Sequence, residues 1–374
     1  MGDQNSIQPW QRRDFSRRER AACGIGMIAD LKGRHRHRVL RLALEALANL
    51  AHRGAVGADG TTTDGTGVLT QIPWRLLRLE DPRLQRYATG ELAVLCLFLP
   101  PGGCMDHEGA RSLVEDTLRA GELKRVAWRR VPVDPSALGY LAAASRPEVV
   151  HVVVERPASV AQQARSERGE AFERHLYLVR RRLEKAAAAA GYDDLAVVSM
   201  SHRTVIYKSM AEASRLPDFY PDLRSADYET RIALFHQRFS TNTQPTWRLA
   251  QPFRMLAHNG EINTLQGNFN WMRTRETQFE SEVWGEDLQD LLPVLEADDS
   301  DSAMLDKALE LLVRSGRSPE HALSMLLPAA LRDQSRLDDD IRAFFEYHAL
   351  FIEPWDGPAA VVSTDGLKAV ASIG

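Results

Sequence analysis

The sequence has few cysteines and no long hydrophobic run, and both absences narrow what the protein can be. Its three cysteines, Cys23, Cys96 and Cys104, are too few for a disulfide scaffold and lack the spacing of a metal-binding cluster. Disulfides are rare in reducing compartments, so we expect a cytoplasmic protein. The apolar run at 92–99 is far shorter than the ~18 residues of a membrane-spanning helix, so we expect no membrane partner.

A strong charge of either sign is also missing. The net charge is −4 over 374 residues, so nothing marks the whole chain as a nucleic-acid binder. With 44% hydrophobic and 26% charged residues, the composition is that of a globular protein with a sizeable core. We find no internal repeat and no low-complexity linker.

An arginine-rich segment precedes the first apolar run. Residues 1–22 contain five arginines but no apolar core of a secretory signal, and Asp3, Asp14 and Glu19 argue against a transit peptide. We interpret residues 1–22 as a leader or propeptide, and residues 23–374 as the functional domain. The alternative is a disordered tail that stays attached.

Cys23 follows this segment in Ala21-Ala22-Cys23-Gly24-Ile25-Gly26. Cleavage after Ala22 would place a thiol and a free α-amino group on one residue. Such an amine has a pKa of roughly 7.7–8.0, so it could serve as the base that generates the nucleophilic thiolate. The alternative is an ordinary buried strand cysteine, and the hexapeptide by itself favours this second interpretation.

Apolar periodicity predicts strands interleaved with helices, which indicates an α/β or α+β domain. Strand patterns cover 24–31, 68–72, 91–99, 195–200, 204–208, 229–239 and 255–257. Helical patterns cover 38–51, 159–190, 262–284, 301–315, 319–331 and 337–350. Residues 195–200 and 204–208 look like a strand pair, and Asp365-Gly366 is a strong signal for a hairpin between 361–364 and 367–372.

Five glycines lie between residues 54 and 67. They indicate turns with positive φ and close backbone packing. Their spacing is not that of a phosphate-binding GxxxxGK[ST] loop, and the acidic positions do not match a calcium-binding EF-hand. We therefore favour a structural turn.

Polar residues crowd the ends of two predicted strands, at 236–243 and 256–264, where functional sites often lie. Asn259-Gly260 could form an oxyanion hole, because the Asn amide and the Gly N–H can both donate to a developing alkoxide. An Asn-Gly hairpin turn is the alternative. Arg238 could clamp a carboxylate with its planar fork, or form a structural salt bridge.

Asp301 opens a predicted helix in Asp298-Asp299-Ser300-Asp301-Ser302. An acid at that position can simply stabilise the helix N-terminus. The functional alternative is that Asp301 binds the ammonium group of a substrate.

In this order and spacing, the motifs resemble those of the class II glutamine amidotransferases. They are Cys23-Gly24-Ile25-Gly26, His52-Arg53-Gly54, residues 238–243, residues 258–264 and Ser300-Asp301-Ser302. Within that group the chain is similar to the glutaminase domain of the glutamate synthase large subunit. That similarity includes residues 251–254, 270–273 and 353–360 and runs nearly the full length from Cys23.

The resemblance implies an N-terminal nucleophile hydrolase fold, an α+β four-layer αββα sandwich of two antiparallel sheets between helical layers. It implies removal of the leader, with Cys23 as nucleophile and its freed amine as base. Asn259 and Gly260 would form the oxyanion hole. The residues implied to bind glutamine are Arg238 at the α-carboxylate, Asp301 at the α-ammonium, and Thr241 in the pocket wall.

The implied reaction is hydrolysis of the glutamine side-chain amide to glutamate and ammonia through a cysteinyl thioester. Ammonia would pass to a glutamate synthase-type flavoprotein partner. No cofactor is expected in this chain, because FMN and an iron–sulfur cluster would belong to that partner. The family continues into an Asp-Arg-Asn-Gly-Leu-Arg-Pro segment beyond the last residue here, so we expect a domain truncated at its C-terminal end.

Two other functions stay open at this point. The chain could be a non-catalytic or regulatory relative that retains its leader. It could also be an amidotransferase that serves a different ammonia acceptor, because the motifs lie in the glutaminase part and acceptor identity resides elsewhere.

Overall fold

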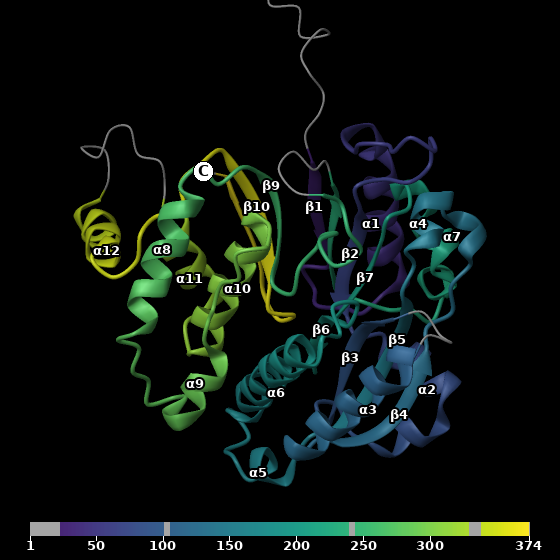
Figure 1. Ribbon diagram of the computed structural model, residues 1–374, viewed down its shortest axis with the longest axis horizontal. Coiled ribbons are helices and arrows are strands. Elements are labelled where there is room, and N and C mark those ends of the chain that lie inside the picture. The colour runs from purple at the N-terminus through teal and green to yellow at the C-terminus, as the bar shows by residue number, and fades with distance from the viewer. Residues whose placement is uncertain (1–22, 101–104, 239–243, 329–337, 374) are drawn as a thin grey trace, which may run out of the picture.

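The computed structural model describes residues 23–100, 105–238, 244–328 and 338–373. In these ranges every pair of neighbouring strands is antiparallel, and the strands form three sheets (Figure 1). The first has the order β1 (Gly24–Ala29), β8 (Ile232–Gln237), β2 (Thr66–Gln71), β7 (Thr204–Ser209). The second has the order β4 (Lys124–Arg130), β5 (Glu148–Glu155), β3 (Leu92–Leu99), β6 (Ala196–Ser201). The third has the order β11 (Ala369–Ile373), β10 (Ala359–Thr364), β9 (Leu256–Gly260).

The α-helices of the described residues lie around these sheets. They are α1 (His37–Asn49), α2 (Trp74–Glu80), α3 (Met105–Ala120), α4 (Tyr140–Ala144), α5 (Ala158–Ala161), α6 (Arg168–Ala190), α7 (Leu216–Phe219), α8 (Leu265–Glu276), α9 (Leu288–Leu291), α10 (Asp301–Arg314), α11 (Pro319–Leu326) and α12 (Asp339–Ala349). In the part of the chain that is described, no helix combines the length and the apolar character needed to cross a bilayer.

The first sheet is built tightly around β1. Gly26 faces Phe235 across the β1–β8 ladder, and a Cβ on Gly26 would lie 2.4 Å from the Phe235 ring. A Cβ on Gly24 would lie 2.9 Å from that of Leu50, just beyond α1, which packs on β1 and β8. The two glycines therefore let a ring and a helix end press against the strand that begins next to Cys23.

The second sheet buries both faces because its side chains alternate across the pleat. Ala93, Leu95, Leu97 and Leu99 of β3 pack with the apolar side chains of α3 and α6. Val94, Cys96 and Phe98 point to the opposite face and join the core shared with the first sheet. The strand is therefore apolar throughout, as expected for a strand covered on both sides.

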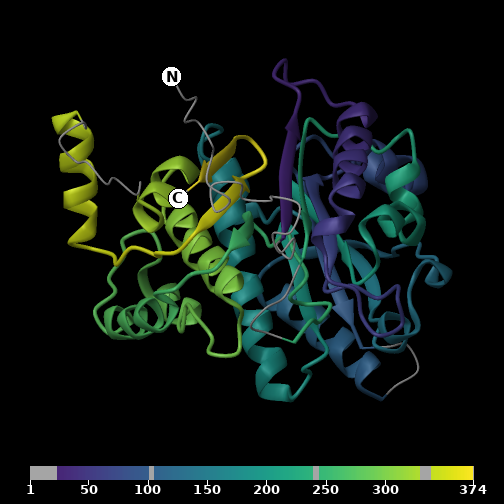
Figure 2. The same ribbon diagram turned by 90° about the horizontal axis from the view of Figure 1, so that it is seen from above.

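The third sheet packs against a separate helical layer. Apolar residues of β9 and β10 share a core with α8, α9, α10 and α11. Two perpendicular views place β10 and β11 between these helices and β1 (Figures 1 and 2). Strands β1 and β8 each contact both β9 and β10, so the third sheet packs on the first through these two strands.

The predicted α+β fold of antiparallel sheets between helical layers is confirmed, with the described strands divided among three sheets. The predicted hairpin around Asp365-Gly366 is also confirmed. It joins β10 to β11, Gly366 has φ +86°, and Asp365 Oδ1 accepts hydrogen bonds from the N–H groups of Leu367 and Lys368, each at 2.8 Å.

Two local predictions were wrong. The strands at 196–201 and 204–209 exist, but they do not pair with each other, because β6 joins β3 and β7 joins β2. The hydroxyl of Ser201 accepts the N–H groups of Arg203 and Thr204, which turns the chain from one sheet into the next. The single helix predicted at 159–190 is divided into α5 and α6.

Buried His151 makes the stability of this fold sensitive to acid. It lies on β5 with 1% of its surface exposed and packs edge-on against Tyr207. Burial, assisted by the charge of Arg129, lowers the pKa of His151 to about 3, against roughly 6.5 in an unfolded chain. As the pH falls below ~6.5, His151 becomes protonated in the unfolded chain but stays neutral in the folded chain. The contribution of neutral His151 to the free energy of unfolding is therefore complete above that pH and declines toward pH 3.

We predict that His151→Phe removes this part of the acid sensitivity. Between about pH 6 and pH 4 the free energy of unfolding of the unmodified protein should fall relative to the variant by about 1.4 kcal/mol per pH unit. Urea unfolding across this range measures the difference. Parallel pH profiles for the two proteins would contradict the assignment.

Candidate functional site

Cys23 stands at the start of the first sheet. It is half-buried and immediately precedes β1. Gly24 pairs with Gln237, the last residue of β8, so the antiparallel register brings Cys23 to the end of the sheet where β8 runs into Arg238. Two residues far apart in sequence therefore meet because their strands are neighbours.

Arg238 is bonded to the loop before β2 and is close enough to other charged groups to be affected by them. Its N–H donates to the carbonyl of Gly65 at 2.8 Å, and only 4% of its surface is exposed. Burial lowers the pKa of its guanidinium from the ordinary value, while the acidic groups of Asp64, Cys23 and Asp301 oppose that shift. Arg238 thus lies within electrostatic reach of both Cys23 and Asp301.

Asn259-Gly260 ends β9 and is not a hairpin turn. Asn259 pairs with Ala360 and Gly260 with Ala359, so the partner strand comes from the far end of the chain. Gly260 has φ +146°, and a Cβ there would lie 1.8 Å from the carbonyl oxygen of Pro358. Only glycine fits this backbone, which excludes the simple hairpin alternative.

Helix α10 runs beside β9 and bonds to it through two side chains, those of Asp306 and Ser302. Asp306 accepts the N–H groups of Met255 and Leu256 at 2.8 and 3.1 Å. Ser302 Oγ lies 2.8 Å from Nδ1 of His258. The arrangement fixes the height of β9 relative to the N-terminus of the helix.

Asp301 bonds to the start of α10 and to the loop that follows β9. It is the first residue of α10 and accepts the N–H of Ser302 at 2.6 Å, after the N-cap Ser300. Its other oxygen accepts the N–H of Ile262 at 3.2 Å, in the loop that follows Gly260. The carboxylate therefore stabilises the helix start and also faces the Asn-Gly corner, with 22% of the side chain exposed.

The glycine-rich turn at 54–67 is structural, as predicted. A Cβ on Gly54 would lie 2.1 Å from the Gln237 amide, and one on Gly65 would lie 2.6 Å from Cβ of Ala250. Asp59 accepts hydrogen bonds from Thr61, Thr62 and Leu141. The turn thus packs beneath the strand end that carries Arg238.

The motif at 353–360 supports the loop after Gly260. The backbone of Asp356 accepts the N–H of Asn263 at 2.8 Å and donates to Oγ1 of Thr264 at 2.9 Å. Gly357 has φ +157°, and a Cβ there would lie 1.9 Å from the carbonyl oxygen of Glu261. These contacts explain why the sequence carries two separate motifs, one on each side of the same corner.

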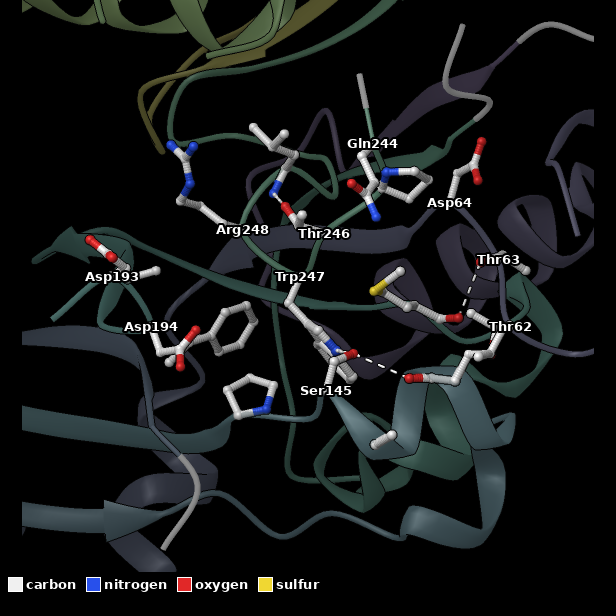
Figure 3. Close-up of a pocket in the computed structure, with 18 of the residues that line it drawn as sticks. Thr62, Thr63, Asp64, Ser145, Asp193, Asp194, Gln244, Thr246, Trp247 and Arg248 are labelled. Carbon is white, nitrogen blue, oxygen red and sulfur yellow. Dashed lines mark hydrogen bonds between the residues drawn. The ribbon is translucent and has the colours of Figure 1, made fainter. Parts of the chain in front are cut away.

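A cavity of about 1030 Å³ lies next to this cluster but is not lined by it. Its walls include Asp64, Trp247 and Arg248 (Figure 3), and Trp247 Nε1 donates to Ser145 Oγ at 3.3 Å. Asp64 in its wall acts on Arg238 through its charge, and Thr63 in its wall bonds to Gly65, whose carbonyl accepts the N–H of Arg238. The cluster, rather than the larger cavity, collects the chemically relevant groups.

The described candidates lie at the ends of four elements, β1, β8, β9 and α10, while Thr241 and the leader at 1–22 fall outside the described residues. Chemically, the cluster offers a thiol, a buried guanidinium, a carboxylate and an Asn-Gly pair able to donate to an oxyanion. Sequence reasoning gave no role to His236, Gln251 or Ser302, which bond to His258. Only the polarity of the segments around them could have indicated such a role.

Comparison with known proteins gives the family of the chain. The family model described as glutamine amidotransferases class-II matches residues 23–374. The chain is 42% identical to the glutamate synthase [NADPH] large chain of Azospirillum brasilense, over 93% of this chain and 23% of that protein. It is 41% identical to ferredoxin-dependent glutamate synthase 2 of Synechocystis sp., over 97% of this chain and 23% of that protein.

A third relative, the glutamate synthase [NADPH] large chain of Bacillus subtilis, is 40% identical over 93% of this chain and 22% of its own length. The chain thus spans less than a quarter of the length of these relatives.

We predict that Gly260→Ala destabilises the fold strongly. A new Cβ would collide with the Pro358 carbonyl on the paired strand, at a φ that side chains rarely adopt. We expect a loss of at least about 2 kcal/mol in the free energy of unfolding, measured by urea denaturation.

The matched control is Gly267→Ala in α8, where a Cβ meets nothing within 4 Å. Removing a glycine from a helix should stabilise the protein by about 0.5–1 kcal/mol. Equal effects of the two substitutions would show that the Asn-Gly corner is not held as described.

Proposed function

Because the chain belongs to the class II glutamine amidotransferases, we propose that it hydrolyses the side-chain amide of glutamine to glutamate and ammonia. The observation that carries the proposal is the position of Arg238. Its buried guanidinium lies close enough to the Cys23 thiol and the Asp301 carboxylate for both to favour its charged form. A nucleophile, a guanidinium that can bind a carboxylate and a carboxylate that can bind an ammonium group suit a small zwitterionic amino acid.

In the proposed reaction, the free α-amine of Cys23 takes the proton of its own thiol. The thiolate attacks the amide carbon of glutamine, and the oxyanion accepts hydrogen bonds from the Asn259 amide and the Gly260 N–H. The protonated amine then gives its proton to the leaving nitrogen. The C–N bond breaks, ammonia departs and a γ-glutamyl thioester remains.

Water completes the cycle. The same amine takes a proton from water as its oxygen attacks the thioester carbon, and the oxyanion forms again between the same two donors. The C–S bond breaks, the sulfur recovers a proton from the amine, and glutamate is released. Base, nucleophile and acid are thus supplied by one residue in both halves of the reaction.

Substrate orientation falls to residues around the thiol. Arg238 binds the α-carboxylate of glutamine through its planar fork, and Asp301 binds the α-ammonium. Both oxygens of Asp301 already accept backbone N–H groups, but each carboxylate oxygen can accept more than one hydrogen bond. Thr241 is assigned to the same pocket from the motif alone.

The ammonia acceptor is inferred from the relatives. All three relatives described above are glutamate synthases, so we propose that ammonia passes to a glutamate synthase-type flavoprotein part. FMN and the iron–sulfur cluster belong to that part, and the residues of this chain need no cofactor for the hydrolysis. The low cysteine content supports a cytoplasmic location.

We predict that Cys23→Ala abolishes the release of glutamate and ammonia from glutamine by the processed protein. The variant keeps the amine and the pocket but has no atom able to form the thioester. A coupled glutamate assay measures the rate, and full activity in the variant would refute the proposal.

The matched control is Cys96→Ala. Cys96 is 2% exposed, and burial raises the pKa of its thiol to about 12, so it is not a nucleophile near neutral pH. This variant should stay within about twofold of the unmodified rate, with the small loss of packing showing in stability instead.

Leader removal separates the enzyme from a non-catalytic relative. If the chain stays joined before Cys23, its nitrogen is an amide and cannot act as a base. Intact-mass measurement of the natively expressed protein should show a species that begins at Cys23. A stable species beginning at Met1 or Gly2 would favour the non-catalytic relative.

A further inference from the structure

Strand β9 has one open edge, although it is buried. In its sheet β9 is the outer strand, hydrogen-bonded to β10 on one side. An outer strand presents N–H and C=O groups without a neighbouring strand. At His258, with 1% of its surface exposed, water cannot replace that neighbour, so both backbone groups need partners within the protein.

The side chain of Gln251 takes the place of the neighbouring strand. The N–H of His258 donates to Gln251 Oε1 at 2.9 Å, and Gln251 Nε2 donates to the carbonyl oxygen of His258 at 3.4 Å. A side-chain amide has an acceptor and donors in one plane, as a peptide group has. One residue therefore engages both backbone groups of His258.

His236 strengthens the same contact from β8. Its Nε2 lies 3.0 Å from the carbonyl oxygen of His258. Because a carbonyl can only accept, Nε2 carries the proton and the ring donates. The carbonyl has two lone pairs, so it can receive His236 and Gln251 together. His236 lies two residues before Arg238, and His258 lies one residue before Asn259.

Gln251 is itself anchored to the first sheet. Nζ of Lys208, on β7, donates to the carbonyl oxygens of Arg248 and Ala250 at 2.7 and 2.8 Å. A Cβ on Gly67 would lie 2.7 Å from the carbonyl oxygen of Gln251, and Gly67 is the β2 residue paired with His236. The first sheet, which carries Cys23 and Arg238, thus fixes the position of Gln251, and the side-chain amide of Gln251 in turn binds β9.

We propose that Gln251 is a positioning residue for the oxyanion hole. Its amide fixes β9, and with it Asn259-Gly260, at the height that the reacting carbonyl requires above Cys23. This inference rests on the function proposed above. Displacing a catalytic group by about 1 Å can cost about 10²-fold in rate, so a strand held through one amide is sensitive to its loss.

The test compares Gln251→Met, which keeps the length of the side chain but cannot bond to His258, with the unmodified protein. We expect kcat for glutamine hydrolysis to fall by about 10- to 100-fold, while KM changes less than about threefold. Alkylation of Cys23 by iodoacetamide needs no oxyanion hole, so its rate should be unchanged. The matched control is Gln266→Met on α8, an exposed glutamine that bonds only to Asn270 among the described residues, which should retain full kcat.

A binding measurement distinguishes positioning from general loss of structure. The γ-aldehyde analogue of glutamate adds the Cys23 thiol to its carbonyl and places an oxyanion in the hole, whereas glutamate only occupies the pocket. In Gln251→Met the aldehyde should bind more weakly by the factor lost in kcat, with glutamate affinity retained. A parallel loss for both ligands, or an unchanged kcat, would overturn the proposal.

Gln251→Glu provides a pH readout that a purely structural role would not give. Ionised, the carboxylate accepts from the N–H of His258 but repels its carbonyl oxygen; protonated, it can donate again. Relative to the unmodified protein, this variant should recover activity as the pH falls. A ratio of the two activities that stays constant with pH would count against the proposal.

If the unmodified processed protein does not hydrolyse glutamine, the proposed function fails and this inference with it. If the unmodified protein is active and the Gln251 variants have the same kcat, only this inference is overturned.

Discussion

The arrangement of the site depends on the backbone N–H and C=O of one buried residue, His258 on the outer edge of β9. Side chains from Gln251 and His236 satisfy these groups where a strand would normally lie. His236 lies on β8 of the first sheet, and the segment that carries Gln251 is bonded to Lys208 on β7 of the same sheet. These side chains therefore connect β9 of the third sheet to the first sheet. Cys23 and Arg238 come from the first sheet and Asn259-Gly260 from the third. The position of one sheet relative to the other therefore decides whether these residues can bind the same substrate.

Charged side chains of α10 also hold β9 in place. Asp306 anchors the start of β9, and Asp301 reaches the loop beyond its end, so one helix holds the strand at two points. The carboxylate of Asp306 is wholly buried, and burial raises its pKa to about 6 although Arg254 lies beside it. Arg238 is buried among acidic groups that favour its charged form. A fixed guanidinium with little competing water is a strong receptor for a carboxylate.

Several parts of this account could be predicted from sequence because each depends on local residues. The glycines beside Cys23, the hairpin at Asp365-Gly366 and the helix that begins at Asp301 follow from spacing and turn chemistry. The roles of the motif residues came instead from the resemblance to a known family, because local spacing alone left the structural alternatives open. Gln251 and His236 were not given a role, because their function depends on a strand edge created by tertiary packing. Strands β6 and β7 enter different sheets because of the turn at Ser201. Apolar periodicity cannot distinguish such a turn from that of a hairpin. Thr241 lies outside the described residues, so its role stays a prediction.

The central claim is that Cys23, Asn259-Gly260, Arg238 and Asp301 surround one ligand. A crystal structure of the processed protein alkylated by 6-diazo-5-oxo-L-norleucine, a glutamine analogue that forms a covalent ketone with a nucleophilic thiol, tests this claim most directly. The account predicts a bond from Sγ of Cys23, the ketone oxygen within hydrogen-bond distance of the Asn259 amide and the Gly260 N–H, the α-carboxylate on Arg238 and the α-ammonium on Asp301. An adduct whose ketone oxygen points away from Asn259-Gly260, or whose α-carboxylate lies away from Arg238, would contradict it.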